Sequence, residues 1–192
     1  MEPIPFIEAQ LQESAQVMAR IRSDFPAAIL AAAETMITAL RNGHKILICG
    51  NGGSAADASH FAAELVGRLQ RDRRALAAIA LTTDISILTA VGNDYGYDQV
   101  FRKQVEALGQ PGDVLIAIST SGNSPNILTA IETARQQGLR VIALSGRGGG
   151  AMVALSDQAL IMPANSSQHI QEGHIAIIHI WCALIENTLF PE

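Results

Sequence analysis

The sequence predicts an α/β fold in which helices cover both faces of a parallel sheet of about five strands. Five short apolar runs are spaced along the chain beyond residue 45, and none of them alternates with polar residues. Such runs are typical of parallel strands that are buried on both faces. Helical stretches separate the runs, and alternation of strands with helices predicts a doubly wound sheet.

Length and composition restrict the class of protein. The chain has 192 residues, of which 48% are hydrophobic and 16% charged, so a disordered or fibrous protein is excluded. One hydrophobic core can serve a chain of this size. We therefore expect a single domain over residues 1–192, with an N-terminal helical segment at about 1–43. The formal net charge of −5 argues against a general nucleic-acid binder, which needs a basic excess.

Two helices are expected before the first strand. Residues 6–21 show helical periodicity. The apolar positions that share one face are Ile7, Leu11, Ala15 and Met18. Pro26 suits the first turn of a second helix, which Gly43 would end.

The elements that follow are expected in strict alternation. The predicted strands are residues 46–49, 77–81, 114–118, 141–144 and 159–162. The predicted helices are residues 54–69, 84–91 with 99–108, 125–137, a short one after Gly149, and a long one over 167–189. The segment 146–150 contains four glycines, which predicts a mobile loop.

Several features predict a cytoplasmic protein without a membrane segment. The first five residues lack the basic region of a signal peptide. The most apolar stretch, residues 175–185, is much shorter than the roughly 20 residues of a membrane span and contains His179. Cys49 and Cys182 each lie in an apolar run, which indicates buried free thiols in a reducing compartment.

Ligands of such sheets bind beyond the carboxyl ends of the strands, where two loops attract attention. The first runs from Gly50 to Ala56 and fits the pattern G-x-G-x-x-A. No acidic residue closes the second strand at the distance a dinucleotide site needs. Glycines before a helix N-terminus still suit an anion or a polyol, and the alternative is a plain strand-to-helix turn.

The second loop, residues 119–125, is rich in hydroxyl groups. Ser119, Thr120, Ser121 and Ser124 lie between a strand and a helix that opens at Pro125. Hydroxyls and free backbone N–H groups at a helix N-terminus form a phosphate cradle. The loop lacks the Gly-Lys-Ser/Thr of a nucleotide P-loop. Ser124 alone has a second explanation, as a helix N-cap.

Two further segments carry possible metal ligands or acid–base groups. His60 and Glu64 are four residues apart, so they share one helix face and suit either a divalent metal, an acid–base pair or a simple hydrogen bond. Gln171 and His179 are eight apart, about 12 Å along an ideal helix, so convergence on one ion implies an irregular helix start near Gln171. A lone histidine such as His179 in an apolar stretch is more often a core residue.

Two other histidines and a run of arginines are further candidates for functional residues. His169 and His174 compete for any metal role, although His174 lies on a different helix face from His179. The basic run contains Arg68, Arg71, Arg73 and Arg74. It is interpreted as a solvated face or a subunit contact, with Arg68 as a second candidate for holding a phosphorylated substrate.

Taken in order, these segments resemble the phosphoheptose isomerase (sedoheptulose 7-phosphate isomerase) family of SIS-domain proteins over nearly the whole chain. The residues that carry the resemblance are Gly-Asn-Gly-Gly-Ser-Ala-Ala-Asp-Ala at 50–58, His-Phe-Ala-Ala-Glu at 60–64, Leu-Thr-Thr-Asp at 81–84, Gly-Asn-Asp-Tyr-Gly at 92–96, Ser-Thr-Ser-Gly-Asn-Ser at 119–124 and Gln-Glu-Gly-His at 171–174. The resemblance implies a three-layer, flavodoxin-like SIS fold with a five-stranded parallel sheet, two leading helices and a long C-terminal helix. It also implies a homotetramer with active sites at subunit interfaces.

The resemblance assigns roles to individual residues. The family's zinc ligands fall on His60, Glu64, Gln171 and His179, with one Zn²⁺ per subunit. Its substrate-binding positions fall on Asn51, Gly52, Gly53, Glu64, Asn93, Asp94, Ser119, Thr120, Ser121, Ser124 and Gln171. Glu64 is implied as the catalytic base and His179 as the acid that serves the substrate oxygens.

The implied activity is the conversion of sedoheptulose 7-phosphate to D-glycero-D-manno-heptose 7-phosphate through an enediol(ate), the first step toward the nucleotide-activated heptose of lipopolysaccharide. A sister group of SIS proteins binds the bacterial replication initiator without isomerase activity, and this is the alternative. Glu64 and His179 favour the enzyme. A sugar-phosphate-binding regulator, which needs the serine loop but no metal, is a third possibility.

Overall fold

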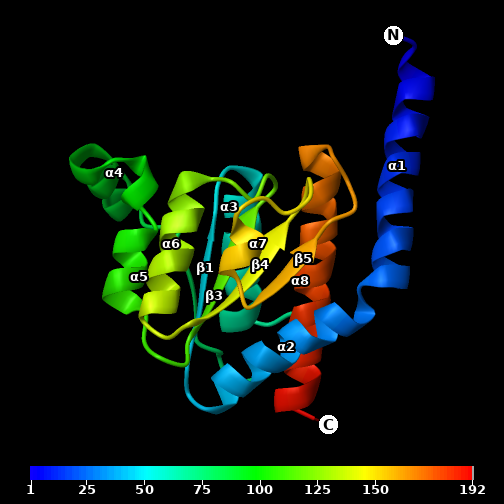
Figure 1. Ribbon diagram of the computed structural model, residues 1–192. Helices are drawn as coiled ribbons and strands as arrows, with labels where there is room; N and C mark the ends of the chain where they lie inside the picture. Colours follow the sequence, from blue (N-terminus) through cyan, green and yellow to red (C-terminus); the bar gives the residue numbers. More distant parts are fainter. Residues whose placement is uncertain (192) are drawn as a thin grey trace.

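The computed structural model describes residues 1–191, and in that part five strands form one all-parallel sheet (Figure 1). The strands are β1 (Ile46–Gly50), β2 (Ala78–Ala80), β3 (Val114–Ser119), β4 (Arg140–Ser145) and β5 (Gln158–Ile161). Their order is β2-β1-β3-β4-β5, which is the flavodoxin-like order. The predicted fold class is therefore confirmed, and every predicted strand exists.

Helices cover both faces of this sheet because successive strand residues point in opposite directions. Ile46 and Ile48 pack into the core beneath α2 (Pro26–Arg41), α3 (Gly53–Val66) and α8 (Ser167–Leu189). Leu47 and Cys49 pack into the opposite core, beneath α5 (Arg102–Leu108), α6 (Pro125–Gln136) and the short α7 (Met152–Leu155). Both cysteines are buried and unpaired, as predicted, and burial raises the pKa of each thiol to about 12.

The first helix, α1 (Pro3–Asp24), stands beside α8 and reaches past the rest of the molecule at its N-terminal end (Figure 1). Its C-terminal half is anchored, since Val17 and Ile21 are buried. Its N-terminal half leaves large apolar side chains in solvent, with Ile7 50% and Leu11 67% exposed. The predicted helical segment before the first strand is confirmed as two helices.

Element ends differ from the prediction where local chemistry stops a helix. The bounds of α8 agree with the prediction at both ends. Helix α3 ends at Val66 instead of residue 69, because the chain turns at Gly67. Helix α4 (Ile85–Tyr95) starts one residue late because Asp84 is its N-cap and accepts a hydrogen bond from the Ile87 N–H. It then continues to Gly96, whose φ of 94° ends it, and the 3₁₀ turn η1 (Tyr97–Gln99) follows.

The glycine-rich segment after β4 packs against the loop after β3. Gly146 and Gly149 are buried, and the N–H of Met152 donates to the carbonyl oxygen of Gly122. Its predicted mobility stays a prediction. No helix in residues 1–191 combines the length and apolar character needed to cross a membrane.

Candidate active site

The two loops that the sequence singled out lie together at the carboxyl edge of the sheet. The glycine loop follows β1 and the serine loop follows β3, and these strands are hydrogen-bonded neighbours with Gly50 paired to Ile118. The chain runs from β1 outward to β2 on one side and on to β3 on the other, so the strand order reverses here. Such a switch point is where doubly wound sheets bind ligands.

Two histidines far apart in sequence meet on two helices that cover one face of the sheet. His60 on α3 and His179 on α8 have their Nε2 atoms 3.0 Å apart, and their ring centroids are 5.1 Å apart. Glu64 lies one turn after His60, and its Oε1 is 3.3 Å from the same His60 Nε2. The imidazole of His60 is 45% exposed, so the group is open to solvent and to a ligand. His179 is also exposed, so the interpretation of it as a core histidine is wrong.

The spacing of these three side chains suits a shared cation. Two ligands that are each about 2.0–2.1 Å from a tetrahedral Zn²⁺ are about 3.3 Å apart. The contacts of 3.0 Å and 3.3 Å around His60 are close to that edge length. Among residues 1–191, however, no group of three or more His, Cys, Asp and Glu side chains has a complete metal-binding arrangement. The fit therefore rests on the two pairs that His60 makes.

The Gln171 side chain lies beside the glycine loop. A Cβ on Gly53 would come 2.5 Å from the Gln171 Nε2, so the amide occupies the space that this glycine leaves free. Gly53 precedes His60 by seven residues on α3, about 10 Å along the helix. Gln171 lies inside regular α8, so the expected irregular start there is wrong. Its role as a fourth metal ligand stays a prediction.

The hydroxyl groups of the serine loop converge. The Oγ of Ser119 lies 3.0 Å from that of Ser124 and 3.5 Å from that of Ser121, while Ser121 Oγ accepts a hydrogen bond from the Asn123 N–H. Ser124 occupies the N-cap position of α6 but makes no side-chain capping bond. The explanation of Ser124 as a simple cap is therefore wrong, and its hydroxyl belongs to the cluster. Thr120 lies in the same loop and is half-buried.

Hydrogen bonds join the glycine loop to neighbouring elements. Asn51 exchanges two amide hydrogen bonds with Asn126 of α6, at 2.9 Å and 2.8 Å, and the Tyr97 hydroxyl donates to Asn51 Oδ1 at 3.2 Å. Sequence reasoning missed Asn126 and Tyr97 because their partner is distant in sequence. Gly52, at the start of α3, has a φ of 56°, a backbone conformation that favours glycine.

Helix α4 carries two predicted substrate ligands near its C-terminal end. Asn93 and Asp94 are exposed, and the Asn93 amide donates to Asp94 Oδ1 at 2.8 Å. Figure 1 shows α4 at the outer edge of the molecule, beyond α5 and α6. Within residues 1–191 no hydrogen bond links these side chains to the glycine loop, the serine loop or the histidine pair.

Asp57 is a further polar group near the site that sequence reasoning missed. It lies one turn before His60 on α3, and its Oδ2 is buried without a hydrogen-bond partner in the described chain. Burial raises the pKa of this carboxyl to about 6, although the nearby His60 lowers it in part. Perturbed carboxyls gather at functional sites. The sequence signal that could have identified Asp57 is its place as a single carboxylate among alanines, directly after the glycine loop.

The rival histidines have structural partners elsewhere. His174 is fully buried and its Nε2–H donates to the carbonyl oxygen of Ser145, while burial lowers its pKa to about 4. His169 is buried between the carboxylates of Glu13, at 3.3 Å, and Glu172, at 3.1 Å. His169 therefore ties α1 to α8.

The basic run divides into two kinds of residue. Arg68 and Arg74 are exposed, in agreement with the prediction of a solvated face. For Arg73 that prediction is wrong, because its side chain is only 1% exposed and forms an ion pair with Glu186 of α8.

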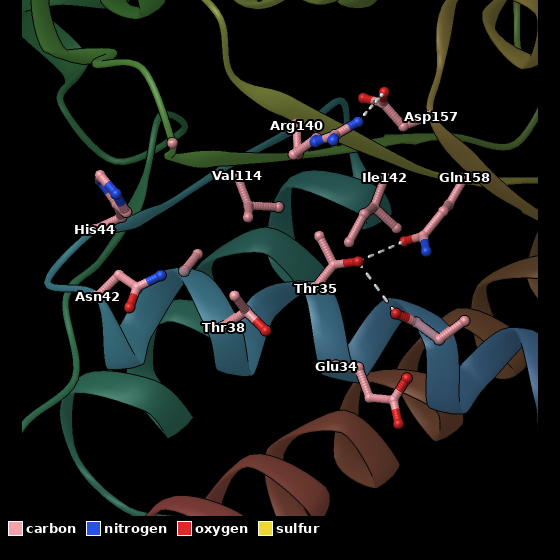
Figure 2. A pocket seen from close by; sticks show the side chains of 13 residues that line it. Glu34, Thr35, Thr38, Asn42, His44, Val114, Arg140, Ile142, Asp157 and Gln158 are labelled. Atoms are coloured by element: carbon pink, nitrogen blue, oxygen red, sulfur yellow. Dashed lines mark hydrogen bonds and ion pairs between the residues drawn. The ribbon is translucent and has the colours of Figure 1, made fainter.

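A cavity of about 690 Å³ lies on the opposite edge of the sheet (Figure 2). It opens between α2 and the first residues of β3, β4 and β5, where Thr35 bonds Gln158 and Arg140 pairs with Asp157. Since parallel strands share one direction, this amino edge is remote from the glycine and serine loops. The cavity therefore does not belong to the candidate site.

Comparison with known proteins gives matches along nearly all of the chain. The family model of the SIS domain matches residues 10–146. A phosphoheptose isomerase of Pelobacter propionicus is 54% identical over 184 residues, covering 96% of this chain and 97% of that protein. The solved phosphoheptose isomerase of Neisseria gonorrhoeae has 48% identity and a TM-score of 0.91, covering 95% of this chain and 98% of that one. That of Francisella tularensis has 42% identity and a TM-score of 0.95, with 97% and 100% covered.

Proposed function

Because this chain belongs to the phosphoheptose isomerases, the SIS-domain family of aldose–ketose isomerases, we propose that it converts sedoheptulose 7-phosphate to D-glycero-D-manno-heptose 7-phosphate. The observation that carries the proposal is the meeting of His60, Glu64 and His179 on α3 and α8, in a chain whose serine loop gathers hydroxyl groups at the N-terminus of α6. This arrangement offers acid–base groups and an anion site on one molecule, as isomerisation of a sugar phosphate requires.

The reaction moves hydrogen between adjacent carbons without a net gain or loss of electrons. A base takes a proton from C1 of the ketose, the C1–C2 enediol(ate) forms, and the proton is returned to C2. In our proposal Glu64 carries this proton between the carbons. His179 donates a proton to the oxygen on C2 and accepts the one on the C1 oxygen, so that the aldehyde forms at C1. Well-placed acid–base groups typically contribute about 10²–10⁴-fold each to the rate.

A divalent cation fits the same residues. His60, Glu64 and His179, with Gln171 as the proposed fourth ligand, would hold one Zn²⁺ per subunit. Bound there, the ion would supply a Lewis acid that stabilises negative charge on the substrate oxygens. Two observations support this. The distances from His60 Nε2 to His179 Nε2 and to Glu64 Oε1 are close to the distance between two ligands of a tetrahedral Zn²⁺, and both imidazoles are exposed.

The serine loop is the proposed anchor for the 7-phosphate. Ser119, Thr120, Ser121 and Ser124 supply hydroxyls beside the N-terminus of α6, where free N–H groups and the helix dipole favour an anion. Binding energy from this remote group would position C1 and C2 against the acid–base residues. Asn51, Gly52, Gly53 and Gln171 are proposed to contact the sugar hydroxyls between the two ends.

We propose that the active form is a homotetramer whose sites lie between subunits. The exposed apolar residues of α1, among them Ile7 and Leu11, provide a surface for another protomer. Asn93 and Asp94 are exposed and hydrogen-bond to each other, which suits ligands that complete a neighbouring protomer's site. We place the enzyme in the cytoplasm, with its product feeding the heptose of lipopolysaccharide.

One experiment tests the function and the metal together. The purified protein is incubated with sedoheptulose 7-phosphate, with and without a chelator, and the aldose is followed by NMR. We expect the heptose 7-phosphate to appear, the chelator to stop its formation and added Zn²⁺ to restore it. No product under any condition would contradict the isomerase and favour an initiator-associating protein or a sugar-phosphate-binding regulator. Full activity in chelator would remove the metal from the proposal.

A further inference from the structure

One buried side chain closes the C-terminal end of α3. The last carbonyl groups of a helix have no partner within the helix. Arg73, which lies beyond the end of α3, donates from Nη2 to the Glu64 carbonyl oxygen at 2.8 Å. Its Nη1 donates to the carbonyl oxygens of Leu65 at 2.9 Å and Gly67 at 3.1 Å. The guanidinium thus takes the place of backbone donors in the turn that carries Glu64.

Arg73 is itself held by α8. Its Nε donates to Glu186 Oε1 at 3.1 Å, and its Nη2 lies 3.1 Å from the same oxygen. Both side chains are only 1% exposed. Glu186 also accepts hydrogen bonds from the backbone N–H groups of Leu69 and Gln70, at 2.9 Å and 3.1 Å. Burial raises the pKa of Glu186, but these backbone donors and Arg73 outweigh it and hold the pKa below its usual range.

The Arg73–Glu186 ion pair connects the same two helices that carry the candidate site, because Arg73 bonds the last carbonyl groups of α3 and Glu186 belongs to α8. Glu186 follows His179 by seven residues, which is close to two full turns, so both side chains point from one face of α8. Glu64 follows His60 by one turn on α3. Helices α3 and α8 are therefore joined at two levels, by the histidine pair and by the buried ion pair. Phe61 of α3 also stacks on Trp181 of α8, with ring centroids 6.0 Å apart.

We propose that Arg73 is a positioning residue that holds Glu64 against His60 and His179, with Glu186 fixing Arg73 in turn. This inference rests on the proposed isomerase function and deepens it. Glu64 is one of the last residues of its helix, and helix ends fray unless their carbonyls find partners. Lysine cannot replace the arginine, because an ammonium group lacks the planar fork that reaches two carbonyls and a carboxylate together.

The test compares Arg73→Lys with the wild-type protein and with Arg102→Lys. Arg102 also pairs with a carboxylate, Glu106, but both lie on α5 and are partly exposed, so its substitution controls for the change of arginine to lysine in an ion pair outside α3 and α8. We expect Arg73→Lys to lower kcat roughly 10–100-fold, because small displacements of acid–base groups cost that much. The KM for sedoheptulose 7-phosphate should stay within about twofold, because the serine loop is untouched. Because unfolded molecules would also lower the apparent kcat at an unchanged KM, kcat is calculated per folded protein, with the folded fraction measured by circular dichroism.

A second readout does not depend on turnover. Each protein is stripped of metal and titrated with Zn²⁺ in competition with a chromophoric chelator. We expect the affinity of Arg73→Lys for Zn²⁺ to fall roughly 10–100-fold, which is the loss typical when a residue that orients a metal ligand is substituted. Glu186→Gln, which keeps an oxygen acceptor and loses the charge, is the second variant should Arg73→Lys fail to fold, and we expect the same direction from it.

The possible failures are distinguishable. A folded Arg73→Lys protein with wild-type kcat and Zn²⁺ affinity would overturn the positioning role while leaving the isomerase intact. A rise in KM at constant kcat would also overturn it. If the wild-type protein does not isomerise the substrate, the proposed function fails and the Zn²⁺ titration alone decides the inference.

Discussion

The Nε2 atoms of His60 and His179 are 3.0 Å apart although 119 residues separate the two histidines in the chain. Helices α3 and α8 lie side by side on one face of the sheet and bring the two imidazoles together. Glu64 extends the contact, since its carboxylate touches the same nitrogen of His60. A small polar group that is open to solvent therefore stands on two helices that also pack through apolar residues such as Phe61 and Trp181.

The first prediction concerns the acid–base residues of this group. Glu64→Gln and His179→Gln should each lower kcat by at least about 100-fold, because each removes a proton carrier while keeping a side chain of similar shape. Both variants should keep the circular dichroism spectrum of the wild type, since both positions are partly or fully exposed. Wild-type turnover by either variant would contradict the role assigned to that residue.

The second prediction concerns the phosphate end. Ser121→Ala should raise the KM for sedoheptulose 7-phosphate about tenfold, the loss expected for one hydrogen bond to a charged group. Steady-state kinetics measures it, and Ser23→Ala, on the remote end of α1, serves as the control. An unchanged KM would place the phosphate at a different anion site. Inorganic phosphate should inhibit the wild type more strongly than Ser121→Ala.

The third prediction concerns assembly. Substitution of Ile7 and Leu11 together by glutamate should convert the proposed tetramer to smaller species, because charges would replace apolar side chains at the interface. Light scattering after size-exclusion chromatography measures the mass. The paired control, Glu8→Gln with Gln12→Glu, alters neighbouring exposed positions of α1 and should leave the mass unchanged. A wild-type protein that is monomeric at micromolar concentration would refute the assembly.

The fourth prediction concerns pH and stability. Burial lowers the pKa of His174 from 6.5 to about 4, so between these pH values the unfolded chain binds a proton that the folded protein does not. The free energy of unfolding should therefore fall as the pH drops from 6.5 to 4, by up to about 3 kcal/mol from this residue. Urea unfolding measured across this range tests it.

The matched variant for this pH effect is His174→Gln. Its amide can still donate to the Ser145 carbonyl oxygen but does not titrate. We expect its unfolding free energy to depend less steeply on pH than that of the wild type below pH 6.5, whatever its value at pH 7.5. Equal slopes for the two proteins would mean that His174 is not the group responsible.

Much of the fold was predictable because the strands are buried on both faces. Continuous apolar runs such as residues 114–118 are short and bounded by turn residues, as strands buried on both faces are, and β3 (Val114–Ser119) lies there. Helix ends were less predictable where a distant residue decides them. The end of α3 depends on Arg73, which belongs to a later loop and is held by a carboxylate 113 residues further on.

The candidate site likewise contains contacts that could be predicted from the sequence and contacts that could not. The contact of His60 with Glu64 and the clustering of the serine-loop hydroxyls were predictable, because these residues are neighbours in sequence. The pairing of His60 with His179 came only from the resemblance to a family. Asn126 and Tyr97, whose partner Asn51 is 75 and 46 residues away, gave no local signal. Long-range contacts between polar side chains leave no periodic trace, so the folded chain was needed to find them.

The close approach of the two loops after β3 and β4 restricts what can change there. Gly122 has a φ of 66°, and a Cβ on it would run into the backbone of Gly149 and Gly150. One on Gly150 would strike Gly122 and the Ser121 carbonyl oxygen in return. The two loops are thus interlocked main chain to main chain, without side chains that could adapt. At the proposed phosphate anchor the shape of the pocket is accordingly limited by backbone, and enlarging it would require rebuilding the segments after β3 and β4 together.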